Sequence, residues 1–327
     1  MAYSPLSVLI TGGTGSFGHA LTKLLLASYD VARIIVLSRD EFKQSEMRRE
    51  IPDARVDFFV GDVRDADRVR RALAAHVDVV IHAAALKQVP ACEYNPWEAV
   101  QTNIYGSQNV VDAAIACGVP RVVALSSDKA CAPLNLYGKT KAVSEALFVR
   151  GNAYAGQSRT RLSVVRYGNV IGSRGSVIPL FQRQRIDGTL GITHLDMTRF
   201  WVGLERTNAV DRWTAPEFVL WALNTMQGGE IFIPKLDSAR LVDVANAVGP
   251  GCEIREIGIR PGEKLHEVMV SADESLSTVE LDDAYVILPT NPSWPFTPPI
   301  GSRPVPFGFS YSSNLNPRPV QYAEQAL

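Results

Sequence analysis

The sequence Thr11-Gly-Gly-Thr-Gly-Ser-Phe-Gly18 decides the fold of the first half of the chain. It follows a short apolar segment, residues 7–10, and it precedes residues 19–27, where apolar side chains recur at helical spacing. Its last three glycines match the pattern G-x-G-x-x-G, and glycines between a strand and a helix let the backbone approach a pyrophosphate at the helix N-terminus. We therefore predict a dinucleotide-binding turn; the alternative interpretation is a plain tight turn.

Further strand-like and helix-like segments alternate along the chain after this turn. Short apolar runs occupy residues 33–37, 56–60, 77–81, 121–126 and 162–165, and helix-like segments separate them. This alternation predicts an α/β fold, a doubly wound parallel sheet of the Rossmann type. The pattern then changes, so we expect a Rossmann domain at 1–170 to which later segments return, a smaller C-terminal substrate domain at 171–290 and a Pro-rich tail at 291–327.

The segment after the second predicted strand, Ser38-Arg-Asp-Glu-Phe-Lys43, lies about 20 residues beyond the glycines, where this kind of fold reads the adenosine ribose. A carboxylate alone would favour NAD, whereas Arg39 and Lys43 offer cations to a 2′-phosphate. Asp40 can equally be a helix N-cap. We predict NADP as the cofactor, with NAD as the alternative.

The segment after the fifth predicted strand reads Ser126-Ser-Asp-Lys-Ala-Cys-Ala-Pro-Leu-Asn-Leu-Tyr-Gly-Lys-Thr-Lys141. Tyr137 and Lys141 lie one turn apart on the helix that should begin near residue 136, and a lysine ammonium there favours the phenolate. This spacing alone is common on solvated helix faces. Three polar residues at the end of the strand, where doubly wound sheets bind ligands, strengthen the prediction of a catalytic site: Ser127, Asp128 and Lys129.

Other strand ends supply the remaining candidates for the cofactor site. Asp62 can accept from the adenine amino group or cap a turn, and the small residues after His82 let the backbone pass close to the nicotinamide half. His82 itself we interpret as structural. The expected cofactor-binding residues are Gly12, Thr14, Gly15, Ser16, Phe17, Gly18, Ser38, Arg39, Lys43, Asp62, Val63, Ala83, Ala84, Ala85, Tyr137 and Lys141.

Composition excludes several classes of function. The net charge is −1 and 46% of residues are hydrophobic, so there is no electrostatic case for nucleic acid or a polybasic membrane anchor. No apolar run reaches the roughly 20 residues of a spanning helix. The four cysteines have no Cys-x-x-Cys spacing, so we expect no metal and free thiols in a reducing cytoplasm. We interpret Cys131 as an apolar filler rather than a nucleophile.

Together these motifs resemble an extended short-chain dehydrogenase/reductase and, within that group, the soluble inverting UDP-N-acetylglucosamine 4,6-dehydratases of pseudaminic-acid-type pathways. The resemblance extends to about residue 289, and the Ser-x-Asp-Lys-Ala run before Tyr137 separates dehydratases from simple reductases and epimerases. Tyr137 also separates the chain from longer relatives that carry methionine there. The sequence departs from the family pattern at Ser127 (usually Thr), at Ala132 (usually Asn) and after Ser313. The segments that carry the resemblance are residues 11–18, 38–47, 83–96, 126–141, 197–201 and 258–269.

The resemblance implies 4,6-dehydration of UDP-N-acetylglucosamine with epimerisation at carbon 5, through transient oxidation by bound NADP. Tyr137 with Lys141 would deprotonate the carbon 4 hydroxyl, with Ser127 bonded to the same oxygen. Lys129 would remove the carbon 5 proton, and Asp128 would protonate the departing carbon 6 hydroxyl. As a base Lys129 must be neutral, so we expect its surroundings to lower its pKa.

The resemblance also implies a UDP-sugar site and a homo-oligomer, a dimer or a hexamer. Lys87 can reach a substrate oxygen or be a solvated loop lysine. The residues expected to bind substrate are Lys87, Tyr167, Asn169, Val177, Arg199, Arg260 and Glu263.

Two alternative functions remain open at this point. A UDP-N-acetylhexosamine 4-epimerase would use Tyr137 and Lys141 without Asp128 and Lys129 as proton carriers. A non-catalytic NADP-binding regulatory protein would keep the glycine turn and would tolerate a broken catalytic segment.

Overall fold

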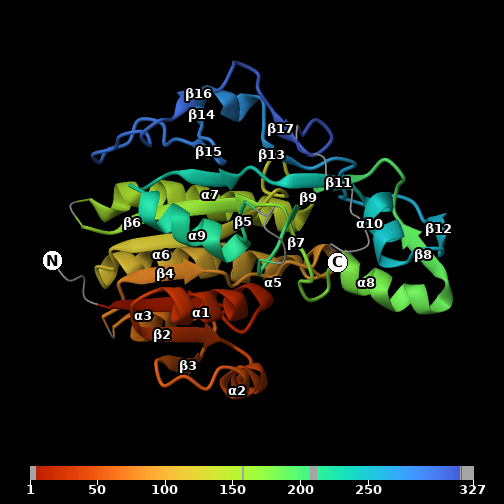
Figure 1. Cartoon of the computed structure of the whole chain (residues 1–327). Coiled ribbons are helices and arrows are strands. Elements are labelled where there is room, and N and C mark those ends of the chain that lie inside the picture. The colour runs from red at the N-terminus through yellow and green to blue at the C-terminus, as the bar shows by residue number, and fades with distance from the viewer. Residues whose placement is uncertain (1–4, 75, 157, 207–211, 317, 319–327) are drawn as a thin grey trace.

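The computed structural model describes residues 5–74, 76–156, 158–206, 212–316 and 318. Its main feature is a ten-stranded sheet with the order β16-β14-β15-β10-β6-β5-β4-β1-β2-β3 (Figure 1). Seven neighbouring strands run parallel: β1 (Leu6–Thr11), β2 (Val31–Ser38), β3 (Val56–Val60), β4 (Val79–His82), β5 (Arg121–Ser127), β6 (Arg161–Tyr167) and β10 (Ile231–Pro234). The prediction of a doubly wound parallel sheet is confirmed.

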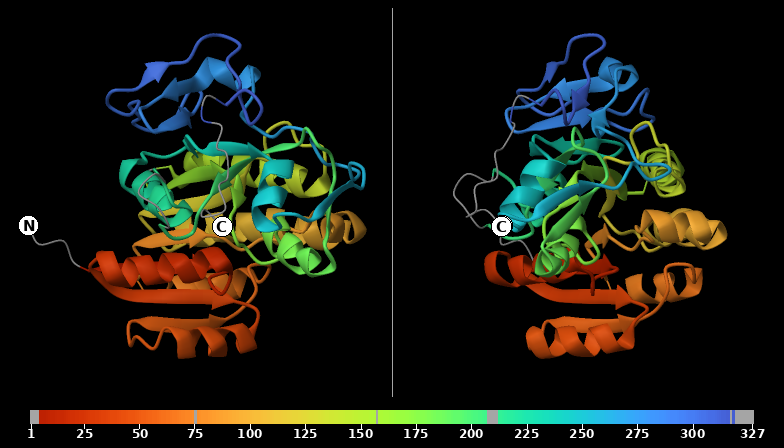
Figure 2. Two further views of the ribbon diagram at one scale, coloured as in Figure 1. Left: turned by 45° about the vertical axis from the view of Figure 1, so that its right-hand side comes forward. Right: turned by 90° about the vertical axis from the view of Figure 1, so that its right-hand side faces the viewer.

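Helices cover both faces of this sheet, because its central strands are apolar on both sides (Figure 2). Helices α1 (Ser16–Ser28), α2 (Glu41–Glu50) and α9 (Ala215–Thr225) pack on one face, where Leu25 and Phe218 are buried in one core. Helices α3 (Ala66–Leu73), α6 (Gly106–Ala116) and α7 (Leu136–Ala155) pack on the other, where Val110 and Phe148 belong to a second core.

The helical segment between β4 and β5 is interrupted. Helices α4 (Val89–Tyr94) and α5 (Pro96–Val100) are followed by a π-helical turn, η1 (Gln101–Tyr105), and then by α6. The turn carries buried Asn103, whose amide bonds the Leu86 backbone at 2.8 and 2.9 Å and Thr140 Oγ1 of α7 at 2.9 Å. A π-turn inside a helix frequently marks a functional site, and here it connects the loop after β4 to α7.

A smaller lobe with its own core lies beside the sheet, at the right of Figure 1. Phe181, Leu190 and Val244 are buried in it. Its elements are α8 (Val177–Gln184), η2 (Arg185–Asp187), β8 (Thr189–Ile192), α10 (Leu241–Val248) and β12 (Glu253–Glu256), next to a small sheet of β7 (Asn169–Val170), β9 (Thr198–Val202) and β11 (Asp237–Arg240).

The last segments return to the main sheet. Strands β15 (Ala284–Ile287), β14 (Thr278–Glu280) and β16 (Arg303–Pro304) extend it antiparallel, after η3 (Asp273–Ser277). Strand β17 (Tyr311–Ser312) pairs with β13 (Val268–Val270), and the buried Tyr311 hydroxyl bonds the Leu236 backbone. The described part of the Pro-rich segment is therefore packed on the earlier elements.

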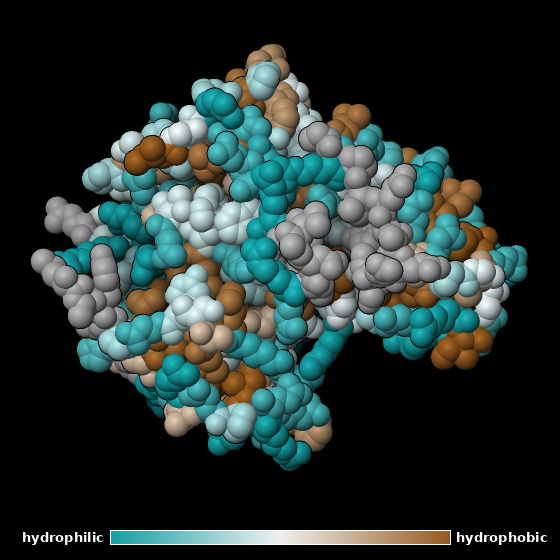
Figure 3. All heavy atoms as spheres, in the orientation of Figure 1, coloured by the Kyte–Doolittle hydropathy of each residue, from teal (hydrophilic) through white to brown (hydrophobic). Residues whose placement is uncertain are grey.

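Hydrophilic and hydrophobic side chains are interspersed on the face shown in Figure 3. In the part of the chain that the structure describes, no helix combines the length and the apolar character needed to cross a bilayer.

Candidate active site

A cavity of about 530 Å³ opens at the carboxyl ends of β1, β4, β5 and β6. In a doubly wound sheet the ligand crevice forms where the strand order reverses, here between β1 and β4. Many of the predicted residues line it: Gly12, Thr14, Gly15, Ser16, Phe17, Gly18, Lys43, Ala83, Ala84, Ala85, Lys87, Ser127, Lys129, Tyr137, Lys141, Tyr167, Asn169 and Val177.

Glycine is required at two points of the turn between β1 and α1. Gly12 has a φ of +65°, and a Cβ there would lie 2.8 Å from the backbone of Ala84. A Cβ on Gly18 would lie 2.2 Å from the carbonyl oxygen of Gly13. The backbone thus leaves an open cradle at the N-terminus of α1, and this arrangement fits the pyrophosphate of a dinucleotide.

A second cavity of about 160 Å³ continues from this cradle, since both are lined by Gly12, Thr14, Lys43, Ala84 and Ala85. It lies where the ribose of a dinucleotide would be expected. Its other predicted lining residues are Ser38, Arg39, Asp62 and Val63.

Two cations at this end are held by carboxylates. Asp40 caps α2, accepting from the Lys43 amide at 3.0 Å, and also pairs with Lys43 Nζ at 3.0 Å. Asp40 is therefore the N-cap of α2 in the structure, as one of its two interpretations predicts. Arg39 lies 3.6 Å from Asp62 and is half exposed. Burial would raise the pKa of Asp62, but Arg64 and Arg39 outweigh it and lower that pKa.

The tyrosine and the lysine that we predict to be catalytic lie in the first turns of α7, which begins at Leu136, as predicted. Asn135 caps the helix by accepting from the Gly138 amide at 2.8 Å. Burial raises the pKa of Tyr137 to about 12, and Lys129 and the Ser127 hydroxyl partly oppose this rise. Burial lowers the pKa of Lys141 to about 8, against the attraction of Glu145.

Asp128 and Lys129 meet at the end of β5. Lys129 Nζ donates to Asp128 Oδ1 at 2.9 Å and to Asn169 Oδ1 at 3.3 Å, and it lies 3.4 Å from Glu267 Oε1. Asp128 is completely buried and also accepts from the Ser127 hydroxyl at 2.8 Å. Burial would lower the pKa of Lys129, but the carboxylates of Asp128 and Glu267 outweigh it and raise that pKa. The expectation of a lowered pKa is therefore wrong for this state of the site.

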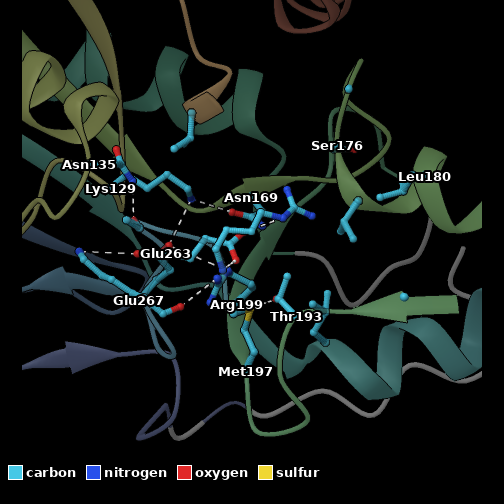
Figure 4. A pocket seen from close by; sticks show the side chains of 18 of the residues that line it. Lys129, Asn135, Asn169, Ser176, Leu180, Thr193, Met197, Arg199, Glu263 and Glu267 are labelled. Carbon is cyan, nitrogen blue, oxygen red and sulfur yellow. Dashed lines mark hydrogen bonds and ion pairs between the residues drawn. The ribbon is translucent and has the colours of Figure 1, made fainter. Parts of the chain in front are cut away.

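The neighbouring cavity, about 310 Å³, lies between this strand end and the smaller lobe (Figure 4). It holds five of the residues predicted to bind substrate, whereas Lys87 and Tyr167 lie on the dinucleotide side. Arg199 is buried, and its terminal nitrogens donate to the carbonyls of Thr198, Leu265 and Lys264 at 2.7 to 3.1 Å. The five residues are Asn169, Val177, Arg199, Arg260 and Glu263.

Sequence reasoning missed Glu267, which the structure places against Lys129. Residues 258–269 carry part of the family resemblance, but within them the resemblance implies roles only for Arg260 and Glu263. Glu267 is 2% exposed and lines the same cavity. A glutamate close after two predicted substrate-binding residues was the available indication; the contact itself requires the fold.

The geometry defines a class of protein: a doubly wound nucleotide-binding fold of the extended short-chain dehydrogenase/reductase type, with a carboxylate, an amine and a Tyr–Lys pair at the carboxyl end of β5 and the start of α7. The model of the family described as polysaccharide biosynthesis protein matches residues 8–289. The chain belongs to this family.

Three similar proteins refine this placement. The UDP-N-acetylglucosamine 4,6-dehydratase (inverting) of Campylobacter jejuni is 48% identical, over 95% of this chain and 93% of its own. The UDP-glucose 4-epimerase of Rickettsia felis is 43% identical, over 86% of this chain and 82% of its own. The X-ray structure of Pen from Bacillus thuringiensis has a TM-score of 0.85 at 37% identity, covering 96% of this chain and 94% of that one.

Proposed function

We propose that this protein is an inverting UDP-N-acetylglucosamine 4,6-dehydratase, a lyase that forms UDP-2-acetamido-2,6-dideoxy-β-L-arabino-hex-4-ulose. The observation that carries the proposal is the direct contact of Lys129 Nζ with Asp128 Oδ1 beside Tyr137, at the mouth shared by the two cavities. Dehydration needs a base for carbon 5 and an acid for carbon 6, and this pair supplies both.

The dinucleotide site fits NADP. Arg39 and Lys43 line the ribose end, and each can exchange its carboxylate partner for a 2′-phosphate. The chemistry that bound NADP would supply is the temporary oxidation of carbon 4, with the same hydride returned later to carbon 6. Arg39→Ala should erase most of a preference for NADP over NAD measured by titration of the purified protein; an unchanged ratio would remove the NADP assignment.

Tyr137 acts on the carbon 4 hydroxyl. Once ionised, a phenol with a pKa raised to about 12 is a strong proton acceptor, and the Ser127 hydroxyl and the Lys129 ammonium stabilise its anion. Lys141 lines the same cavity and, with a pKa of about 8, carries its charge at neutral pH. The ketone formed at carbon 4 then acidifies the proton on carbon 5.

A single proton shift prepares the second half of the reaction. Transfer of one proton from Lys129 to Asp128 along their 2.9 Å hydrogen bond converts the ion pair into a neutral amine and a carboxylic acid. The amine takes the carbon 5 proton, and the acid protonates the departing carbon 6 hydroxyl, which leaves as water. The pair has then returned to its ionic form. When the hydride has been returned to carbon 6, a proton from solvent that reaches carbon 5 from the opposite face gives the L-configured sugar.

The remaining assignments concern the substrate and the setting. We assign UDP to the cavity of Asn169, Arg199, Arg260 and Glu263, and we keep the division into a cofactor domain (1–170), a nucleotide-sugar domain (171–290) and a tail (291–327). We infer a homo-oligomer, and a product that enters a pseudaminic-acid-type pathway, from the resemblance. The four free thiols agree with a cytoplasmic setting.

A 4-epimerase is the second candidate, because relatives with that name share 42–43% identity with this chain. The purified protein, incubated with UDP-N-acetylglucosamine in deuterium oxide, separates the two candidates. A dehydratase product has lost water and carries deuterium at carbon 5 in its proton spectrum. An epimerase gives an isomer of unchanged mass. A regulatory protein that only binds NADP leaves the sugar unchanged, and either of the last two results overturns the proposal.

A further inference from the structure

Glu267 is a buried carboxylate with incomplete hydrogen bonding. Its backbone is fixed, since its amide donates to Ser313 Oγ at 3.0 Å and its carbonyl accepts from the Ser313 amide at 2.8 Å. Its Oε2 has no hydrogen-bond partner within the described residues, although Lys264 Nζ lies 3.6 Å away. Burying a carboxylate in this way is unfavourable, so the position calls for a functional explanation.

The other oxygen of Glu267 faces the proposed base. Oε1 lies 3.4 Å from Lys129 Nζ and 3.9 Å from Arg199 Nε, and Figure 4 shows Glu267, Lys129 and Arg199 grouped at the bottom of the substrate cavity. Arg199 cannot turn away without breaking its three bonds to backbone carbonyls. Arg199 therefore helps to fix the Glu267 carboxylate, and this carboxylate faces Lys129 with its negative charge.

Four ionisable groups act on Lys129: Asp128, Glu267, Arg199 and Tyr137. In the proposed mechanism Asp128 protonates the leaving carbon 6 hydroxyl, and Tyr137 acts on the carbon 4 oxygen. Arg199 repels the ammonium, and Glu267 attracts it. Lys264 affects Lys129 indirectly, because its ammonium neutralises part of the Glu267 charge.

We propose that Glu267 is a positioning residue that holds the Lys129 ammonium in the site and sets the pH above which the Lys129–Asp128 pair loses the proton that it shares. This inference rests on the proposed dehydratase function. The carboxylate keeps Lys129 charged until the substrate is in place, and it holds Nζ within reach of Asp128 for the proton transfer. It does not touch the reacting carbon atoms itself.

The test is the pH dependence of kcat and KM for water loss from UDP-N-acetylglucosamine. The Lys129–Asp128 pair reacts only while it holds one shared proton, so in the wild type kcat should fall at high pH, where Lys129 loses that proton to solvent and Asp128 stays ionised. Glu267→Gln removes the stabilising charge, so this falling limb should move to lower pH by about one to three units, with KM changed much less. Glu253→Gln, an exposed glutamate of β12, is the matched control and should leave the limb in place.

Two further variants keep the test decisive if Glu267→Gln does not fold. Lys264→Met leaves the Glu267 charge less compensated, so its limb should move to higher pH, opposite to Glu267→Gln. Glu267→Asp keeps the charge and should keep the limb near that of the wild type while lowering kcat. A limb that stays at the wild-type pH in folded Glu267→Gln, or in Lys264→Met, overturns the inference. A wild type that releases no water overturns the dehydratase proposal instead.

Discussion

At the scale of single residues, the site depends on how two neighbours share one proton. Asp128 is completely buried and accepts from both Ser127 and Lys129, while its second oxygen has no hydrogen-bond partner among the described residues. The 2.9 Å hydrogen bond from Lys129 Nζ therefore gives a proton a direct path to this carboxylate.

Asp128→Asn should lose about two to four powers of ten in kcat, because an amide cannot give a proton to the leaving hydroxyl. NADP binding should persist, since Asp128 is not among the residues that line the dinucleotide cavity. Steady-state kinetics and a cofactor titration on the same preparation measure both. Asp112→Asn on the exposed side of α6 is the control. Wild-type turnover in Asp128→Asn would contradict its role as the acid.

Lys141 predicts a pH-dependent stability. Burial lowers its pKa from 10.5 to about 8, so between these values the unfolded chain holds a proton that the native state has released. Stability then rises with pH through this window, and below pH 8 the native state carries the full cost, roughly 3 kcal/mol. Lys141→Met should raise the free energy of unfolding by up to that amount at pH 7, and the gain should vanish near pH 10.5.

Urea unfolding at several pH values measures this effect. Lys139→Met, an exposed lysine two residues earlier on α7, provides the baseline. Equal gains for both variants at pH 7 would show that the buried ammonium is not destabilising.

The sequence predicts that the candidate site residues lie close together, but it does not predict the charge state of Lys129. Tyr137, Lys141, Ser127 and Asp128 belong to one continuous segment, and a strand followed by a helix is enough to bring them together. Two carboxylates, Asp128 and Glu267, keep Lys129 protonated, and Glu267 comes from far along the chain. The contact between Glu267 and Lys129 becomes visible only when the loop before β13 is packed against the end of β5.

At the scale of elements, α7 is pressed against the loop that carries Lys129. A Cβ added at Gly138 would lie 2.2 Å from the carbonyl oxygen of Lys129 and 3.1 Å from Pro133 Cβ. Asn135, the cap of this helix, donates to the carbonyl of Gly262 at 2.9 Å and so ties α7 to the loop of the substrate cavity. The helix start thus sets the distance between Tyr137 and Lys129.

Gly138→Ala should separate α7 from this loop. We expect kcat to fall at least tenfold and stability to fall by about 1–3 kcal/mol, as for overpacking in a core. Lys139→Ala, at the next and exposed position, should change neither quantity appreciably. Kinetics and urea unfolding of the two variants compare them directly. Wild-type activity in Gly138→Ala would mean that the contact yields without moving the site.

The element pattern also shows where local sequence is insufficient. The parallel strands were predicted because apolar runs end in glycines or polar residues. The π-turn η1 was not predicted, because residues 101–105 read as ordinary helix. In the structure, Asn103 of this turn bonds Leu86 and Thr140, which lie in two other segments. The π-turn is therefore stabilised by tertiary contacts that local sequence does not reveal.

At the scale of the whole molecule, a buried ion cluster joins the late segments to the sheet. Arg166 of β6 is 2% exposed and bonds both oxygens of Glu145 on α7 at 2.7 and 2.9 Å, both oxygens of Glu274 on η3 at 2.9 and 3.2 Å, and the Met269 carbonyl at 2.8 Å. The sequence predicts that later segments return to the Rossmann domain, but it does not predict this contact of Glu274 with Arg166, because the partners lie in segments with no shared local pattern.

Arg166→Met should therefore destabilise the protein by about 3–5 kcal/mol, because two carboxylates lose the cation that compensates them. The loss should be smaller at acidic pH: against the effect of burial, Arg166 helps to hold the pKa of Glu274 below its usual value, and in the variant Glu274 can take up a proton instead. Arg33→Met is the matched control, since the Arg33–Asp57 pair is 39% and 50% exposed and should contribute at most about 1 kcal/mol. Urea unfolding of both variants at pH 7 and pH 5 measures the difference. If Arg166→Met cost no more than Arg33→Met, the cluster would not be what holds the C-terminal segments, and through them the loop of Glu267, against the catalytic strand.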